Sequence, residues 1–188
     1  MNPTLNEAIK LRNLGFAIHW LRQNSKIPIL SGWSEAPVMT VEELTQTYRQ
    51  GYNIGFRPGK FTVVNGKEIC VLDVDVRGGE RYGDEAYAAA KSLMGVFEPN
   101  VMSGSGVGRH QLVGFDIGNS PDKAATTLRE SDLWLLDDKP CQPHTKGSRP
   151  AWQVELLSTG KNVVLPPSIH PDTNNPYIWL KEIDHENM

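Results

Sequence analysis

The segment that most constrains this chain is residues 68–76, EICVLDVDV, where an apolar run carries aspartates at alternate positions. Side chains two residues apart on a strand project from the same face, so Asp73 and Asp75 point together. The apolar neighbours predict a strand that is buried on both faces. Two carboxylates there repel each other and lose hydration, and a divalent cation such as Mg²⁺ or Mn²⁺ resolves that conflict. The segment therefore predicts a metal site on a central strand.

The same pattern has a second, purely structural interpretation. At a strand end both carboxylates can reach water or cap the turn at Gly78-Gly79. A D-x-D pair alone does not separate these two interpretations. Other segments of the chain must therefore supply the remaining parts of any site.

A glycine-rich segment, SGSGVGRH at residues 103–110, is the second candidate. Closely spaced glycines let backbone N–H groups approach an anion, and Ser105 adds a hydroxyl. Arg109 and His110 can bind phosphate oxygens. A strand is expected at 109–115, so the segment is neither a P-loop nor a dinucleotide fingerprint. A flexible loop with an ordinary terminal histidine is the alternative.

Two later segments complete the candidates. Glu155 lies between apolar neighbours in QVELL, although a lone glutamate on a strand is usually solvent-facing. The segment VVLPPSIHP follows, and its two prolines stiffen the backbone that carries Ser168 and His170.

Composition indicates an ordinary globular protein. The 188 residues are 39% hydrophobic and 22% charged, which fits one domain spanning residues 1–188. No apolar run is long enough to span a bilayer, and the polar amino terminus does not resemble a signal peptide. We therefore expect a cytoplasmic protein without a membrane partner.

Charge and cysteine usage exclude some classes of partner. The net charge of −3 argues mildly against a protein that coats nucleic acid, although residues 139–154 are locally basic. Two cysteines cannot build a disulfide framework, and Cys70 fits a core position. Cys141 and His144 form only half of a zinc site, so no zinc is expected.

Hydrophobic periodicity predicts an α/β or α+β fold with a mixed sheet. The first helix is expected to begin with a Thr4–Glu7 capping box and to end at Gly15, and Asn65-Gly66 signals a hairpin. Residues 137–150 are expected to form a polar loop. Further helices are expected at 41–50, 84–93 and 121–128, and strands at 16–21, 53–56, 61–64, 68–76, 109–115, 151–157, 162–165 and 177–180.

In this order, the segments resemble the archaeo-eukaryotic primase superfamily, most closely the primase-polymerase domain at the amino terminus of plasmid and phage replication proteins. The resemblance covers nearly the whole chain. It rests on GFAIHW, KIPI and GW near the amino terminus, NIG before VLDVD, then SGSGVGRH, QVELL and VVLPPSIHP.

The resemblance implies roles for particular residues. The acidic residues Asp73, Asp75 and Glu155 would bind two catalytic ions, Mg²⁺ or Mn²⁺. A glutamate stands where many relatives have aspartate, and the cysteine-rich zinc insertion of some relatives is missing. The incoming nucleotide would be bound by His110, which is also assigned as catalytic, and by Ser105, Gly106, Arg109, Lys161, Ser168 and His170.

The implied fold is a two-unit primase-polymerase core, in which an N-terminal α/β unit packs on an RNA-recognition-like mixed sheet with the active site in the cleft between them. The implied function is DNA primase or polymerase activity by a two-metal mechanism. Its partners would be a single-stranded DNA template, a primer strand, nucleoside triphosphates and possibly a helicase in the same chain or in trans.

Three alternatives remain open at this point. A D-x-D glycosyltransferase explains VLDVD but leaves SGSGVGRH and Glu155 without roles. A noncatalytic single-strand-binding or replication-initiator module would need stacking aromatics in a basic groove. An inactive family member is disfavoured, because every acidic and histidine position is filled. The sequence does not distinguish ribonucleotides from deoxyribonucleotides, or priming from extension.

Overall fold

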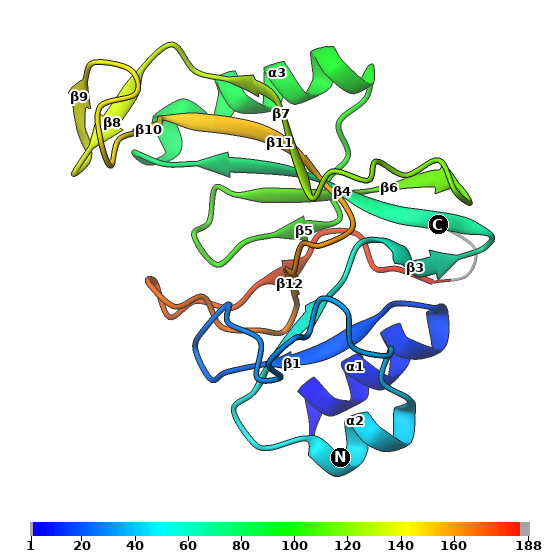
Figure 1. Ribbon diagram of the computed structural model, residues 1–188. Coiled ribbons are helices and arrows are strands. Elements are labelled where there is room, and N and C mark those ends of the chain that lie inside the picture. Colours follow the sequence, from blue (N-terminus) through cyan, green and yellow to red (C-terminus); the bar gives the residue numbers. More distant parts are fainter. Residues whose placement is uncertain (1, 185–188) are drawn as a thin grey trace.

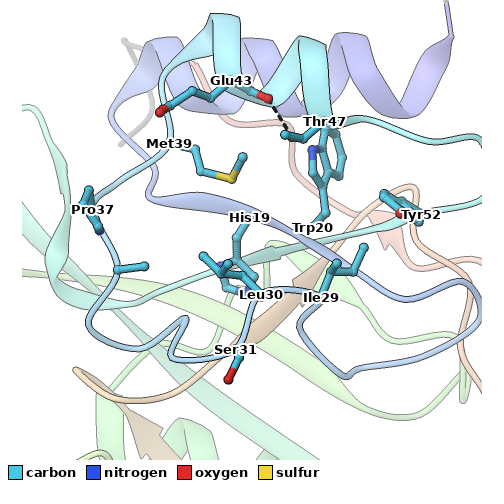
Figure 2. Close-up of a pocket in the computed structure, with 11 residues that line it drawn as sticks. His19, Trp20, Ile29, Leu30, Ser31, Pro37, Met39, Glu43, Thr47 and Tyr52 are labelled. Atoms are coloured by element: carbon cyan, nitrogen blue, oxygen red, sulfur yellow. Dashed lines mark hydrogen bonds between the residues drawn. The ribbon is translucent and has the colours of Figure 1, made fainter.

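The structure is a computed structural model that describes residues 2–184 and has an α+β fold (Figure 1). A small unit containing the amino terminus lies below a larger sheet in this view. The helices are α1 Pro3–Leu14, α2 Val41–Thr47 and α3 Gly83–Met94, with a 3₁₀ turn η1 at Glu80–Tyr82. The strands are β1 Ile18–Leu21, β2 Asn53–Phe56, β3 Gly59–Val64, β4 Lys67–Val76, β5 Val101–Met102, β6 Arg109–Asp116, β7 Ala125–Glu130, β8 Trp134–Leu136, β9 Lys139–Cys141, β10 Arg149–Pro150, β11 Trp152–Leu157, β12 Val163–Leu165 and β13 Ile178–Trp179.

The N-terminal unit combines α1 and α2 with a three-stranded sheet in the order β1-β2-β12. Helix α1 begins two residues earlier than the expected Thr4–Glu7 capping box implies, and that capping box was wrong, because Asn2 is the N-cap and accepts a hydrogen bond from the Thr4 N–H. It ends at Gly15, whose φ of 110° favours glycine. The capping box of α2 forms between Thr40 and Glu43, as its sequence indicates. No helix within residues 2–184 is long and apolar enough to cross a membrane.

The large sheet has the strand order β13-β5-β6-β4-β11-β7, with β3 paired to β4. Every strand pairing among the described residues is antiparallel, so the expectation of a mixed sheet was wrong while the α+β class is confirmed. The Asn65-Gly66 turn joins β3 to β4, as the hairpin signal predicts.

Strand β4 contributes to two separate cores through its alternating side chains. Ile69 and Val71 pack into the core shared with the N-terminal unit. Leu72 and Val74 pack on the other face, beneath α3. Asp73 and Asp75 continue the face of Ile69 and Val71, because odd-numbered side chains share one side of the strand. The carboxylates therefore point toward the N-terminal unit, at the place where its apolar contacts with β4 end.

Two segments fold differently from the sequence-based expectation. The helix expected at 121–128 is wrong: residues 125–130 form β7, which pairs with β11. Pairing along the edge of the sheet outweighed a weak local helix pattern. The loop expected at 137–150 contains β9 and β10, which form a three-stranded sheet with β8 that projects from the large sheet in Figure 1.

Candidate active site

Three strands bring the site's acidic and imidazole groups into one row. Asp73 on β4 is directly opposite His110 on β6 and directly opposite Glu155 on β11. Directly opposed residues project from the same face of an antiparallel pair, with Cβ atoms about 5 Å apart. Gln153 is opposite Asp75 in the same register. Asp73 is therefore flanked on both sides by the groups that the sequence analysis singled out.

The electrostatic environment of Asp73 shows that the three carboxylates lie close together. The pKa of Asp73 is raised to about 7, first by burial and then by the negative charges of Asp75 and Glu155. Lys26 and Arg77 oppose this rise. An excess of negative charge at a half-buried position favours binding of a cation.

His110 faces Asp73 with one ring nitrogen and has the other free of protein partners. Its Nε2 lies 3.4 Å from Asp73 Oδ1. Its Nδ1 is buried and has no hydrogen-bond partner within residues 2–184. The pKa of His110 is lowered to about 4, mainly by burial and further by the charge of Lys26. The imidazole is therefore neutral at neutral pH.

A cavity of about 100 Å³ lies over the Asp73 and His110 end of this row, and Glu155 lies outside its lining. Both units contribute to its lining, in agreement with the expected cleft between them. Lys26 comes from the N-terminal unit, after β1, and His170 and Tyr177 come from the segment that joins β12 of that unit to β13 of the large sheet. The other lining residues come from the large sheet and the loop between β5 and β6. The lining consists of Lys26, Asp73, Val74, Asp75, Ser103, Ser105, Gly108, His110, His170 and Tyr177.

The glycine-rich loop between β5 and β6 is held by its own serines. Ser103 and Ser105 share a hydrogen bond between their hydroxyls, 2.8 Å long, and Ser105 Oγ accepts the N–H of Gly108. A side chain at Gly104 would place its Cβ 2.4 Å from the Asn175 carbonyl oxygen. Glycine is therefore required there by close packing. Gly106 has a φ of 85° at the exposed tip of the loop, outside the cavity lining.

Arg109 lies on the opposite face of the sheet from His110. Its guanidinium donates to the carbonyls of Gly106 and Gly108 and lies over the ring of Tyr87 in α3. Adjacent residues on a strand point to opposite faces, so Arg109 cannot share the His110 side. In this arrangement Arg109 braces the glycine-rich loop and does not line the cavity.

The three residues after β11 that the resemblance suggested are placed differently from one another. His170 lines the cavity, and its ring lies 5.8 Å from that of Tyr177. Ser168 is buried, and its hydroxyl accepts the N–H of Ile54 in β2. Lys161 lies in the turn between β11 and β12, outside the cavity lining.

The carboxylate groups at this site are the kind of ligand that binds a hard divalent cation, but their side chains are not arranged around one ion. Arg77 Nη2 lies 2.5 Å from Asp75 Oδ2, so this carboxylate is directed to a cation of the chain itself. Within residues 2–184, no three His, Cys, Asp or Glu side chains surround a common point in the manner of metal ligands. The negative charges of Asp75 and Glu155 both act on Asp73. Asp75 Oδ2 must leave Arg77 before this oxygen can become a metal ligand.

Sequence reasoning did not assign roles to Lys26, Arg77, Ser103 or Tyr177. Arg77 is two residues beyond Asp75, and that spacing on a strand signals a shared face. Ser103 opens the motif that contains Ser105. Lys26 opens the KIPI segment of the resemblance but was given no role there, and for Tyr177 no local signal existed, because the chain fold alone brings both to β4.

Comparison with known proteins gives one clear result. The model of a family described as Bifunctional DNA primase/polymerase, N-terminal, matches residues 8–187. No curated protein matches the sequence. The matched region includes each strand that contributes to the cavity.

Proposed function

The chain belongs to the bifunctional DNA primase/polymerase N-terminal family, and from this premise we propose that it is a template-directed nucleotidyltransferase. It would add nucleotides to a 3′ end or make primers during DNA replication. The observation that carries the proposal is the row of Glu155, Asp73 and His110 across β11, β4 and β6, under a glycine-rich loop. Acidic residues, a neutral imidazole and serine hydroxyls at one cavity suit a triphosphate and its cations.

The carboxylates of Asp73, Asp75 and Glu155 are the proposed ligands of two divalent ions, Mg²⁺ or Mn²⁺. Bound there, such ions would supply Lewis acidity to the attacking and leaving oxygens. The mutual repulsion that raises the pKa of Asp73 is the chain's own contribution, because it favours a cation over three uncompensated charges. Arg77 keeps Asp75 compensated when the ions are absent.

The remaining residues of the cavity bind and orient the nucleotide. In the reaction the primer 3′ oxygen bonds to the α-phosphorus while the bond to the pyrophosphate oxygen breaks. Ser103, Ser105 and Gly108 of the loop line the space where phosphates would lie, and the serine hydroxyls are its candidate donors. His110 lines this space as a neutral imidazole, so it could contact a phosphate oxygen without adding a formal charge. His170 lines the same cavity.

The partners that follow from this activity are a single-stranded DNA template, a primer strand and nucleoside triphosphates. A helicase, in the same chain or in trans, would supply the single strand. Such an enzyme would act in the cytoplasm. The basic residues at 139–149 on the projecting β8–β10 sheet offer a surface that template phosphates could contact.

The two alternative functions receive less support. The family match covers the segments for which a glycosyltransferase has no use, including the loop before His110 and the strand of Glu155. A noncatalytic single-strand-binding module requires exposed stacking aromatics, whereas Trp20 and Trp152 are core residues. The acidic row has no purpose in such a module.

A primer-extension assay tests the proposal. A single-stranded template is supplied with and without a labelled primer, with Mg²⁺ or Mn²⁺, and with ribonucleotides and deoxyribonucleotides in separate reactions. Extension that requires the template and a divalent ion is expected. Template binding that survives chelation, without any incorporation, would instead indicate the noncatalytic alternative.

A further inference from the structure

Lys26 is a cation at the catalytic cavity, and its charge lowers the pKa of Asp73 without a direct ion pair in the part of the chain that the structure describes. It lies in the turn after β1, and its exposed side chain lines the cavity together with Asp73, His110 and His170. It forms no ion pair with any residue in the described part of the chain. Its charge nevertheless acts on the cavity, because it lowers the pKa of His110 and His170.

The backbone of Lys26 is fixed by a polar pair, a half-buried Asn162 and a buried His19. Asn162 Nδ2 donates to the Lys26 carbonyl at 2.9 Å, and Asn162 Oδ1 lies 2.8 Å from His19 Nε2. A carbonyl only accepts, so the amide must present its NH₂ to Lys26 and its oxygen to His19. His19 therefore carries its proton on Nε2. Burial lowers the pKa of His19 to about 4, so this neutral form persists at neutral pH.

A second asparagine holds the same turn against the other side of the cavity. Asn53 Nδ2 donates to the carbonyls of Ser25, at 3.0 Å, and Ile169, at 2.8 Å. Asn53 Oδ1 accepts the N–H of Ile169. One buried side chain thus links the residue before Lys26 to the residue before His170. Asn53 on β2 therefore holds the backbone next to both cavity-lining residues, Lys26 and His170.

A glycine in β2 leaves room for this arrangement. A Cβ at Gly55 would lie 2.3 Å from Asn162 Oδ1 and 2.8 Å from His19 Nε2. These distances are too short for non-bonded atoms, so any side chain at this position would displace the pair. The NIG segment of residues 53–55 therefore has a local purpose: it positions the Lys26 turn.

We propose that Lys26 binds the polyphosphate of the incoming nucleotide, and that Asn162, with His19, is a positioning residue that acts through Lys26. The inference rests on the proposed nucleotidyltransferase function and deepens it. A mobile lysine side chain loses conformational freedom when it binds, and a fixed backbone at its base reduces the space that it must search. The cavity otherwise presents carboxylates and neutral imidazoles, which leaves Lys26 as its only cationic lining residue within residues 2–184.

Calorimetric titration of the whole chain tests the proposal, with dATP and dAMP as probes in Ca²⁺ and with ATP and AMP in parallel. Lys26→Ala should weaken dATP binding about 10–100-fold, as expected for a charge-assisted contact, and leave dAMP binding within about twofold. Lys26→Arg should recover most of the loss. Arg22→Ala removes an exposed cation from the same turn outside the cavity and should change neither affinity.

The positioning role is tested by a double-mutant cycle. Asn162→Ala should weaken dATP binding about 3–10-fold, and Asn162→Asp, which keeps an oxygen for His19, should do at least as much damage. In the Lys26→Ala background, Asn162→Ala should cost almost nothing further. A full, additive loss in that background would show that Asn162 does not act through Lys26.

The outcomes separate this inference from the proposed function. If the wild-type chain binds no nucleotide and extends no primer, the proposed function fails. If the wild-type chain binds dATP and Lys26→Ala binds it equally well, only the Lys26 assignment fails. Equal losses for dATP and dAMP would also overturn the assignment, since the change would then act on the whole cavity. Inorganic tripolyphosphate, which has no base or sugar, should show the same dependence on Lys26.

Discussion

His110 Nε2 lies 3.4 Å from Asp73 Oδ1, and the two residues are directly opposed partners on β6 and β4. This pairing joins the end of the glycine-rich loop to the acidic strand. Burial acts on the two groups in opposite directions, because it raises the pKa of Asp73 and lowers that of His110. Both groups therefore favour their neutral forms unless a cation enters the site.

Asp73→Asn should reduce template-dependent extension by roughly 100–1000-fold or more, because it removes the central carboxylate of the row. The thermal midpoint without divalent cations should equal or exceed that of the wild type, since one of three repelling charges is lost. Primer extension and a thermal melt measure the two effects. Extension by this variant at the wild-type rate would refute the metal assignment.

The extension rate of Glu155 variants should depend on whether a carboxylate is kept and on where it lies. Glu155→Asp keeps the charge but withdraws it by one methylene, and we expect a loss of up to about 100-fold in extension rate. Glu155→Gln keeps the length and removes the charge, and should lose more than Glu155→Asp. The reverse order would indicate that Glu155 acts by shape and not by binding a cation.

Gly55→Ala should lower the free energy of unfolding by about 1–3 kcal/mol, because its Cβ would overlap Asn162 and His19. Gly83→Ala is the matched control. Gly83 has helical backbone angles, and a Cβ there would make an ordinary contact, 3.4 Å from Tyr87. This control should be neutral or stabilising by up to about 1 kcal/mol. Urea denaturation compares them, and similar destabilisation by both variants would contradict the steric argument.

Acid should destabilise the protein through His19, whose pKa falls from 6.5 to about 4 on folding. Between these values the unfolded chain binds a proton that the folded chain excludes. The His19 contribution is therefore complete above about pH 6.5 and is lost as the pH falls toward 4, by roughly 2–3 kcal/mol. His110 and His170, with lowered pKa values, add to this trend, whereas Asp73, whose pKa is raised to about 7, opposes it.

The variant His19→Gln isolates the His19 contribution, because glutamine keeps an N–H donor for Asn162 and does not titrate in this range. The difference in unfolding free energy between wild type and variant should shrink or change sign between pH 7 and pH 4.5. A constant difference across that interval would show that His19 protonation is not linked to folding.

The elements whose local patterns were strong could be predicted from sequence. Alternation along EICVLDVDV placed Asp73 and Asp75 on one face, and Asn65-Gly66 fixed the hairpin before them. Gly15 and Thr40 marked a helix end and a helix start. Where the pattern was weak, at residues 121–128, the expected helix was wrong, since pairing of β7 with β11 outweighed local propensity.

The sequence by itself determined which residue types the site contains and which side of its strand each aspartate occupies, because strand periodicity is a local property of the backbone. Only the tertiary structure decided which residues meet. The registers of β6 and β11 against β4 set His110 and Glu155 beside Asp73, and the same alternation turned Arg109 away. Lys26 reaches the cavity from a distant part of the chain through asparagine contacts, which depend on long-range packing that no local pattern encodes.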